Sequence, residues 1–385
     1  MVCSCASKEE INTDTTTKKS YIQDLYKTVS GELVQPLDTT IGVFTYYDKY
    51  SEQASNIVRE SIKEYHQLAD ANNYYVDDAG EIIKNIRYIN ENGINEYVVV
   101  DEKLFDMLKE AKALMKLTDG NFNITLGRTI DLYDDLFSVV GEVRDDPTFV
   151  DMNNALACKA TVDNIDEIVE LNENMQAVRL RIPEVCNSSV KLQIGAFSKG
   201  YILSNIAKQL NILDISYLLD FGSSSINTHY GKKDTKSTWN IGIRSPLENK
   251  DYEYVIALDK NYAVSTSADD QRYYFTYTNN DKLIRRHHIL NPETGLSENY
   301  YRGVTVIAAG GESGVLDVLS TALYNIPSMS KRKEMVEKFN ETYNLTIGYA
   351  LMEENEDGTL NIIVNEEMAN HITSVTDDTT KIIVE

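Results

Sequence analysis

Apolar and polar residues alternate along this chain with two different periods, which predicts a protein of mixed α and β structure. The run from Thr40 to Tyr46 is short, apolar and rich in β-branched residues, as is typical of a strand. From Ser51, which can cap a helix, apolar residues recur every three or four positions and predict a helix. Its apolar face consists of Ala54, Ile57, Val58, Ile62, Tyr65 and Leu68. We therefore expect the folded part of the chain to begin near residue 36.

The same alternation continues towards the C-terminus. Tyr97–Val100 predicts a second strand, and the apolar spacing after it predicts a helix that ends at Thr118–Gly120. Asp357 and Gly358 suit a turn between two further strands. The stretch from Asp131 to Asp151 is acidic and poorly periodic, so we expect a surface insertion there. The pattern favours one catalytic unit with an insertion.

Composition narrows the class of function. The chain has 385 residues, 42% of them hydrophobic, which is enough for one large core or two modest ones. Its 37 lysines and arginines face 60 aspartates and glutamates, for a net charge of −23. This charge repels a nucleic-acid backbone, so we expect no nucleic-acid partner. A small anion can still bind where backbone N–H groups, lysines or a metal ion receive it.

The N-terminus has the character of a tether. Cys3 and Cys5 precede a polar stretch from Lys8 to Ser20, and no run of 18 apolar residues occurs in the chain. The beginning is similar to a bacterial lipoprotein without its signal peptide, with Cys3 or Cys5 as the lipid-bearing residue. The alternative is an arbitrary terminus with two incidental cysteines. We predict a flexible tether over residues 1–35, a catalytic domain over 36–371, a C-terminal tail over 372–385, and an extracytoplasmic, lipid-anchored location.

A first chemical signal is a candidate anion site. Val190, Leu192 and Ile194 alternate with polar residues like a half-buried strand, and Gly195–Gly200 then leads into a helical pattern. A loop of small residues before a helix lets the backbone approach a phosphate, and Lys199 adds a positive charge. A purely structural strand-to-helix junction explains the same residues.

A second signal is a pair of hard oxygen ligands. Asp317 and Thr321 are four residues apart in a helical pattern, so both lie on one face, which we expect to differ from the buried face. Mg²⁺ prefers such oxygens and commonly takes further ligands from substrate phosphates. The alternative is that Asp317 only stabilises a helix N-terminus.

A third signal is the positive segment from Arg285 to Gly295, which ends in a Pro/Gly turn. Arginines pair well with phosphate, and histidines such as His287 and His288 exchange protons near neutral pH. A histidine pair at the surface of an edge strand is the alternative reading.

Together these segments resemble the ApbE family of FAD:protein FMN transferases over residues 40–370. The family's motifs are matched, in order, by Thr118–Asn123, Gly195–Tyr201, Asp220–Ser224, Thr266–Ala268 with Arg272–Tyr274, His288–Gly295, and Asp317 with Thr321–Leu323. Asn123 and Asn291 replace acidic residues of the family pattern, and Ser223 and Ser224 replace a glycine and an acid. The serine-rich variant is similar to flavin transferases of Gram-positive extracellular electron transfer.

The resemblance implies an α+β fold with a largely antiparallel sheet flanked by helices, and a site for Mg²⁺ and FAD. Mg²⁺ would be held by Asp317, Thr321 and the main-chain oxygen of Ala196, with His288 and Asp317 as catalytic residues. The implied contacts to FAD are Tyr75, Asn90, Asp119, Ala196, Ser198, Lys199, Ser267, Arg272, His288 and Thr294. FMN would pass to a Thr or Ser hydroxyl of an acceptor flavoprotein, with release of AMP. Two alternatives are an FAD pyrophosphatase and a non-catalytic FAD-binding lipoprotein.

Overall fold

A nine-stranded sheet forms the centre of the molecule. The computed structural model describes residues 18–45, 50–213, 215–230, 238–247, 250–258, 261–376 and 378–385. The strand order is β1-β4-β8-β9-β12-β15-β16-β17-β19, and neighbours are antiparallel except β17 and β19. The strands are β1 (Lys18–Ile22), β4 (Ile41–Thr45), β8 (Tyr217–Phe221), β9 (Ser225–His229), β12 (Tyr262–Ala268), β15 (Gly303–Ala309), β16 (Ile347–Glu354), β17 (Leu360–Val364) and β19 (Lys381–Val384). This architecture confirms the predicted α+β class.

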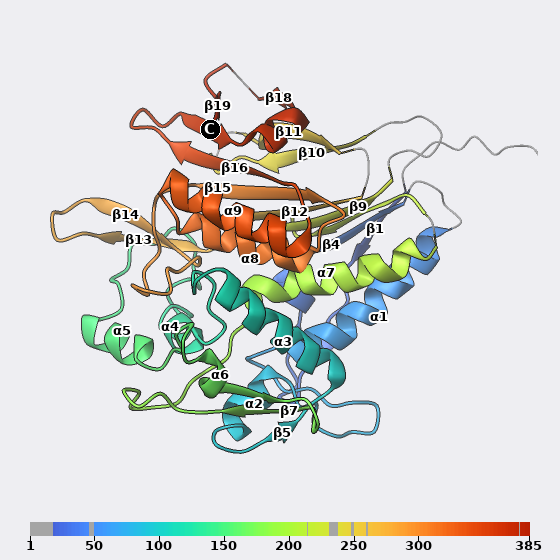
Figure 1. Cartoon of the computed structure of the whole chain (residues 1–385), viewed down its shortest axis with the longest axis vertical. Helices are drawn as coiled ribbons and strands as arrows, with labels where there is room; N and C mark the ends of the chain where they lie inside the picture. Colours follow the sequence, from blue (N-terminus) through green and yellow to red (C-terminus); the bar gives the residue numbers. More distant parts are fainter. Residues whose placement is uncertain are drawn as a thin grey trace, which may run out of the picture.

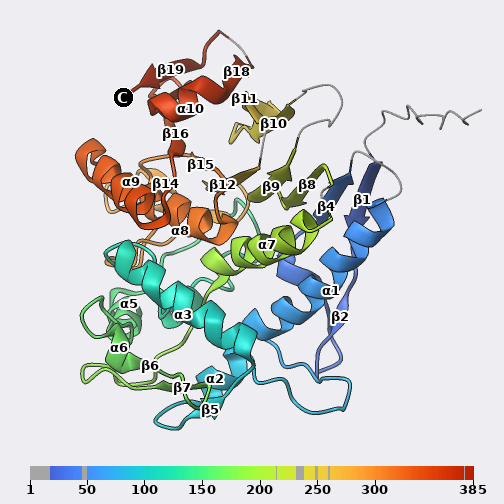
Figure 2. The same cartoon turned by 45° about the vertical axis from the view of Figure 1, so that its right-hand side comes forward.

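Helices cover one face of this sheet and enclose the main core (Figures 1 and 2). They are α1 (Ser51–Ala69), α3 (Glu102–Leu117), α7 (Gly195–Asn211), α8 (Ser313–Tyr324) and α9 (Met329–Tyr343). Helix α7 packs against α8, and α8 packs against β12 and β15. Helices α1 and α3 confirm two sequence predictions, although Tyr50, not Ser51, is the N-cap of α1. The side chain of Asp101 caps α3 through the Lys103 amide.

Smaller sheets lie on either side of this core. One contains β10 (Trp239–Arg244), β11 (Tyr252–Leu258) and β18 (Ile372–Val375) and, with α10 (Glu366–His371), encloses a second apolar cluster. Another contains β5 (Val98–Val99), β6 (Val169–Asn172) and β7 (Ala177–Leu180). The remaining elements are β2 (Tyr26–Lys27), β3 (Leu33–Val34), η1 (Pro36–Asp38), α2 (Ile86–Asn92), α4 (Gly127–Asp131), α5 (Phe149–Leu156), α6 (Ile165–Ile168), β13 (Tyr273–Tyr277) and β14 (Leu283–His287).

The predicted boundaries of the catalytic domain are too narrow at both ends. Residues 18–35, assigned to a tether, supply edge strand β1 and the small pair β2–β3, and Ile22 is buried in the main core. Residues 372–385, assigned to a tail, supply β18 and β19. Strand pairing made over long sequence separations recruits both segments. Cys3 and Cys5 lie outside the described residues. Among the helices of the described chain, none is both long and apolar enough to cross a membrane.

The acidic insertion between α4 and α5 is irregular, as predicted, but it is not only a surface excursion. Tyr133 is fully buried, stacks on Phe137 and belongs to a third apolar cluster with Tyr274 of β13. The Asp146 carboxylate accepts hydrogen bonds from Tyr274 Oη at 2.7 Å and from Arg286 Nη2 at 2.8 Å. The insertion therefore braces the β13–β14 hairpin.

The segment before α7 also differs from its prediction. Val190, Leu192 and Ile194 are buried, yet they form no strand, and only Lys191 makes an isolated bridge, with Leu126. The Asn90 side chain replaces a neighbouring strand: its amide donates to Leu192 O at 3.0 Å, and its Oδ1 accepts from Leu192 N at 2.7 Å. A disulfide between Cys158 and Cys186, which the sequence did not predict, joins the end of α5 to the chain before this segment.

Candidate active site

The site is built where α7 and α8 touch. A side chain on Gly200 would place its Cβ 2.4 Å from Ser313 O and 2.7 Å from Asp317 Cγ, so only glycine allows this approach. Gly314 is equally confined, with a Cβ position 2.9 Å from Tyr201 N. The two glycines bring the first turns of α7 against the carboxylate of α8.

Asp317 is buried at this contact, with 7% of its surface exposed. Its Oδ2 accepts a hydrogen bond from Gly200 N at 2.8 Å, and Ser225 Oγ of β9 lies 2.9 Å from both carboxylate oxygens. Burial raises the Asp317 pKa to about 7, against the opposing effect of these donors and of Lys199. The expectation that Asp317 lies on a face apart from the buried one is wrong, because every residue of α8 except Thr321 is buried.

Thr321 lies one turn further along α8 and is only half-buried. Ser267 Oγ of β12 is 3.4 Å from Thr321 Oγ1 and 2.8 Å from Ser320 Oγ. Ser267 of β12 therefore lies beside the face of α8 that carries Thr321.

The donors present suit a hard cation such as Mg²⁺. In a regular helix the N–H of Gly200 points towards the carbonyl oxygen of Ala196, four residues earlier. Because this N–H donates to Asp317 Oδ2, we infer that the carboxylate lies beside the exposed first turn of α7. Asp317, Thr321 and Ala196 then offer a carboxylate, a hydroxyl and a carbonyl oxygen, which are Mg²⁺ ligands. Within the described residues no group of three or more His, Cys, Asp or Glu side chains could hold a metal. The site would therefore need oxygens from the substrate.

Positive charge gathers in front of Asp317. Burial lowers the pKa of Lys199, and the charge of Asp317 opposes this shift while that of Arg272 adds to it. The amide of His288 donates to Arg272 O at 3.1 Å, and the Arg272 guanidinium pairs with Asp38 at 3.0 Å. The side chain of His288 is exposed to solvent on one side. Desolvation by the surrounding protein is the largest cause that lowers its pKa below the usual range, and the charges of His287 and Arg272 lower it further. His288 is therefore neutral at pH 7.

The other positive residues of the same segment are engaged elsewhere. His287 is fully buried, its Nε2 lies 2.8 Å from Glu298 O, and burial lowers its pKa to about 4. Arg285 pairs with buried Asp269 at 3.1 Å, and Arg286 pairs with Asp146. The reading of a histidine pair at the surface is therefore wrong for His287, and neither arginine is free to receive a phosphate.

Several predicted FAD contacts lie elsewhere or have other partners. Tyr75 is fully buried, and its hydroxyl donates to Asp70 Oδ2 at 2.7 Å, so its ring has no free face for stacking. This corrects the prediction for Tyr75. Asp119 follows the C-cap of α3 and pairs with Lys338 of α9 at 2.7 Å. Ser198 is buried in α7, and Thr294 is exposed in the turn that closes at Gly295.

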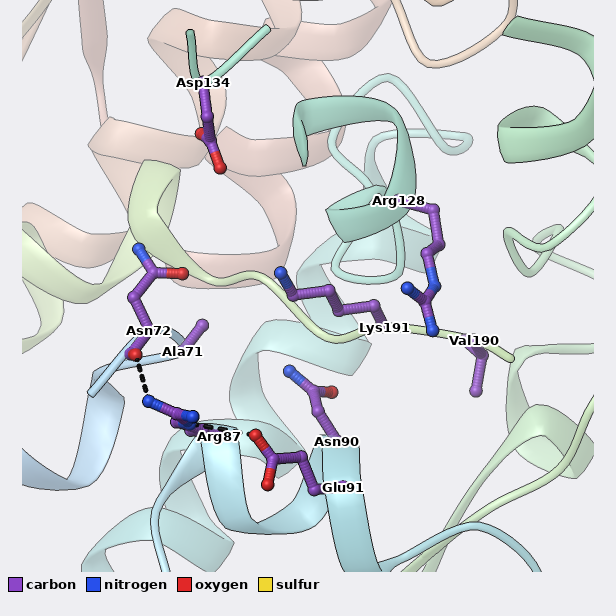
Figure 3. A pocket seen from close by; sticks show the side chains of 9 residues that line it. All are labelled: Ala71, Asn72, Arg87, Asn90, Glu91, Arg128, Asp134, Val190 and Lys191. Atoms are coloured by element: carbon purple, nitrogen blue, oxygen red, sulfur yellow. Dashed lines mark hydrogen bonds and ion pairs between the residues drawn. The ribbon is translucent and has the colours of Figure 1, made fainter. Parts of the chain in front are cut away.

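An open pocket of 480 Å³ lies between α2, α4 and the segment before α7 (Figure 3). Its lining consists of Ala71, Asn72, Arg87, Asn90, Glu91, Arg128, Asp134, Val190 and Lys191. Burial and the nearby Asp131 raise the pKa of Asp134 in this lining, against the opposing effect of Lys191. Asn90, a predicted FAD contact, lies in its wall while also holding Leu192. The lining holds three cations and two carboxylates, and Arg87 is paired with Glu91 at 2.9 Å and Lys191 with Asp131 at 2.5 Å.

Ser225 and Gly200 are site residues whose roles the sequence did not reveal. Ser225 is the last of the three serines at 223–225, where the sequence differs from the family pattern. Its hydroxyl is hydrogen-bonded to Asp317. The run of three serines was the available signal, but its partner is 92 residues away in the chain. Only the pairing of β8, β9 and β12 brings Ser225 beneath α8.

Comparisons with known proteins show the family of this chain. The model of the ApbE family matches residues 37–346. An FAD:protein FMN transferase of Treponema pallidum is 26% identical over 59% of this chain and 60% of its own length. Another, of Klebsiella pneumoniae, is 25% identical over 72% of this chain and 77% of its own.

Solved structures share the fold. The ApbE protein of Thermotoga maritima has a TM-score of 0.66 at 23% identity, covering 92% of this chain and 100% of its own. The flavin transferase ApbE of Vibrio cholerae has a TM-score of 0.65 at 18% identity, with coverage of 92% and 100%. The family model and the curated relatives define the class of this chain as flavin transferases. The extent of the family match makes it plain that this chain belongs to the ApbE family, a family of enzymes.

Proposed function

We propose that this chain is a Mg²⁺-dependent FAD:protein FMN transferase that modifies a Thr or Ser hydroxyl of an acceptor protein and releases AMP. The observation that carries the proposal is the hydrogen bond from Gly200 N to Asp317 Oδ2. This contact holds the carboxylate of α8, which also carries Thr321, against the first turns of α7, which carry Lys199. The names of the relatives in Treponema and Klebsiella support the same reaction.

Each residue has a chemical task in this reaction. Bound Mg²⁺ would neutralise charge on the FAD pyrophosphate. Lys199 and Arg272 bind and orient the same phosphates, since cations pair with phosphate oxygens. The acceptor oxygen bonds to the FMN phosphorus as the P–O bond to AMP breaks, and AMP leaves with that bonding pair. His288 would accept the hydroxyl proton or orient the hydroxyl, and its lowered pKa, which makes it a weak base, favours the orienting role.

One assay separates this reaction from its two rivals. The protein is incubated with FAD and Mg²⁺, with and without an acceptor protein, and AMP and denaturation-resistant flavin fluorescence are measured. Fluorescence on the acceptor together with AMP supports transfer. AMP in equal amounts without acceptor, and no labelled protein, would replace the proposal with FAD hydrolysis. Retention of intact FAD with no AMP would replace it with a carrier function.

We also propose that the enzyme works outside the cytoplasm, lipid-anchored through Cys3 or Cys5, where covalently bound flavin serves extracellular electron transfer. The Cys158–Cys186 disulfide supports this location, because disulfides persist in oxidising compartments. Detergent-phase partitioning of the protein from its own host tests it. Recovery in the aqueous phase with Cys3 and Cys5 unmodified contradicts the anchor and leaves the transferase reaction untouched.

A further inference from the structure

The β13–β14 hairpin carries a third, short strand that belongs to the acidic insertion. Gly141 N donates to Tyr273 O at 3.0 Å, Phe275 N to Glu142 O at 2.7 Å, and Arg144 N to Phe275 O at 2.8 Å. Residues 141–144 therefore run parallel to β13, with Val143 opposite Phe275. Figure 1 shows this hairpin projecting from the body of the molecule. We call residues 141–144 the edge segment.

The outer side of the edge segment is open. Because Phe275 bonds to the residues on both sides of Val143, the N–H and C=O of Val143 point away from β13. In the described part of the chain, no group bonds to the main chain of Val143. Its side chain is 56% exposed, and those of Val139 and Val140 are 45% and 50% exposed. An open edge with exposed valines is a template for an added strand.

This edge is continuous with the active site. Arg272 precedes β13 and His288 follows β14, and the two are hydrogen-bonded to each other at 3.1 Å. Gly141 pairs with Tyr273, so the edge segment begins at the end of the hairpin that carries both site residues. Asp146 fixes the arrangement through its bonds to β13 and β14. A chain bound along the edge would therefore be directed towards His288.

The charge around the edge selects the kind of partner. Six carboxylates and one arginine lie between Asp131 and Asp146. Asp135, Glu142 and Asp145 are exposed, and the arginine, Arg144, is already paired with Glu142. The complementary partner is an extended segment with β-branched residues and an excess of lysine or arginine.

We propose that the acceptor protein binds the edge segment as an additional strand, through such a basic, extended stretch next to its Thr or Ser. This inference rests on the proposed function. From the added strand to His288 there are three strand spacings, roughly 14 Å, which an extended chain crosses in about four residues. The basic stretch therefore lies about four residues or more to one side of the modified hydroxyl.

The test uses a pool of synthetic peptides, each with one threonine and otherwise randomised, incubated with the full chain, FAD and Mg²⁺. Flavinylated peptides are captured by their flavin and sequenced by mass spectrometry. We expect enrichment of Lys, Arg and β-branched residues, and depletion of Pro, on one side of the threonine. Enrichment that is absent, or confined to the residues adjacent to the threonine, overturns the proposal.

Two variants with a matched control link that preference to the edge. Val143→Pro removes the outward N–H and also restricts the backbone of Val143 and of the preceding Glu142. We expect kcat/KM for the enriched peptides to fall about tenfold, with AMP release without peptide unchanged. Val143→Thr keeps the N–H and should match the wild type. Asp145→Lys should abolish the preference for Lys and Arg, and circular dichroism checks the fold of each variant.

Equal labelling by the wild type, Val143→Pro and Asp145→Lys contradicts edge docking while leaving the transferase function intact. No labelled peptide and no AMP with any variant means that the transferase function fails and edge docking fails with it. A wild-type dimer that Val143→Pro converts to a monomer assigns the edge to a second copy of this chain and also overturns acceptor docking.

Discussion

The Gly200 amide donates a hydrogen bond of 2.8 Å to the Asp317 carboxylate, so the residue that is the best candidate for binding the metal also ties α8 to the first turns of α7. Ser225 Oγ adds a second donor from the sheet beneath. Three elements of the fold, α7, α8 and β9, therefore meet at one carboxylate, and changes there should affect both catalysis and stability.

Asp317→Ala should abolish Mg²⁺-dependent AMP release and also destabilise the protein. Removal of the carboxylate takes away the anionic metal ligand and leaves Gly200 N and Ser225 Oγ without their buried acceptor, at a cost of about 1–3 kcal/mol. Urea denaturation and an AMP assay measure the two effects. Thr321→Val is the comparison, because Thr321 is half-buried and should lose activity with less stability. Full activity of Asp317→Ala would exclude the proposed metal site.

Gly200→Ala should separate α7 from α8, whereas Gly195→Ala on the same helix should be tolerated. The new Cβ at 200 meets the Ser313 backbone, where overpacking costs about 1–3 kcal/mol, while the nearest atom at 195 is a side-chain oxygen at 3.5 Å. Thermal melting and AMP release of both variants are the measurements. Equal stability of the two variants would show that the contact at Gly200 can relax without loss.

His287 should make the fold sensitive to mild acid. Its folded pKa of about 4 lies below the unfolded value near 6.5, so the unfolded state binds the proton first. Stability is thus complete above pH 6.5 and falls between pH 6.5 and 4, by about 2 kcal/mol at pH 5. The free energy of unfolding of the wild type and of His287→Asn is measured at pH 7.5 and at pH 5. The loss of stability between the two pH values should be smaller in His287→Asn by this amount. Identical slopes would contradict burial of a neutral His287.

The Cys158–Cys186 disulfide should stabilise the wall of the pocket. It closes a loop with a sequence separation of 28, for which the entropy of the unfolded chain predicts about 3–4 kcal/mol. Cys158→Ser with Cys186→Ser should lower the free energy of unfolding by this amount without reductant and should be insensitive to dithiothreitol. A wild type whose stability does not respond to dithiothreitol would mean that the bond contributes nothing or does not form.

Much of the local structure was fixed by periodicity. The apolar spacing located α1 and α3, the Asp357–Gly358 turn separates β16 from β17, and the helical pattern after Gly195 became α7. The motifs also identified Asp317, Thr321, Lys199 and His288 as candidate site residues. The types and order of such residues can be recognised in the sequence without knowledge of the fold.

The sequence misled where partners came from distant segments. Residues 18–22 looked like tether because a short edge strand has no pattern of its own, and only pairing with β4 orders it. The segment at 190–194 looked like a strand because burial alternates, yet its partner is the Asn90 side chain. Tyr75 looked available for stacking because nothing local shows that His66 and Asp70 enclose its hydroxyl.

The sequence by itself determined the class of fold, the positions of the principal helices, and the residue types from which we propose Mg²⁺ ligands, phosphate contacts and a base. The tertiary structure decided which side chains are free to do so. It placed Asp317 in a buried contact with Gly200 and Ser225, engaged Arg285 and Arg286 with Asp269 and Asp146, and separated buried His287 from exposed His288. The physical reason is that residue type sets what a group can do, whereas desolvation and hydrogen-bond partners, which set its charge and availability, come from segments far apart in the chain.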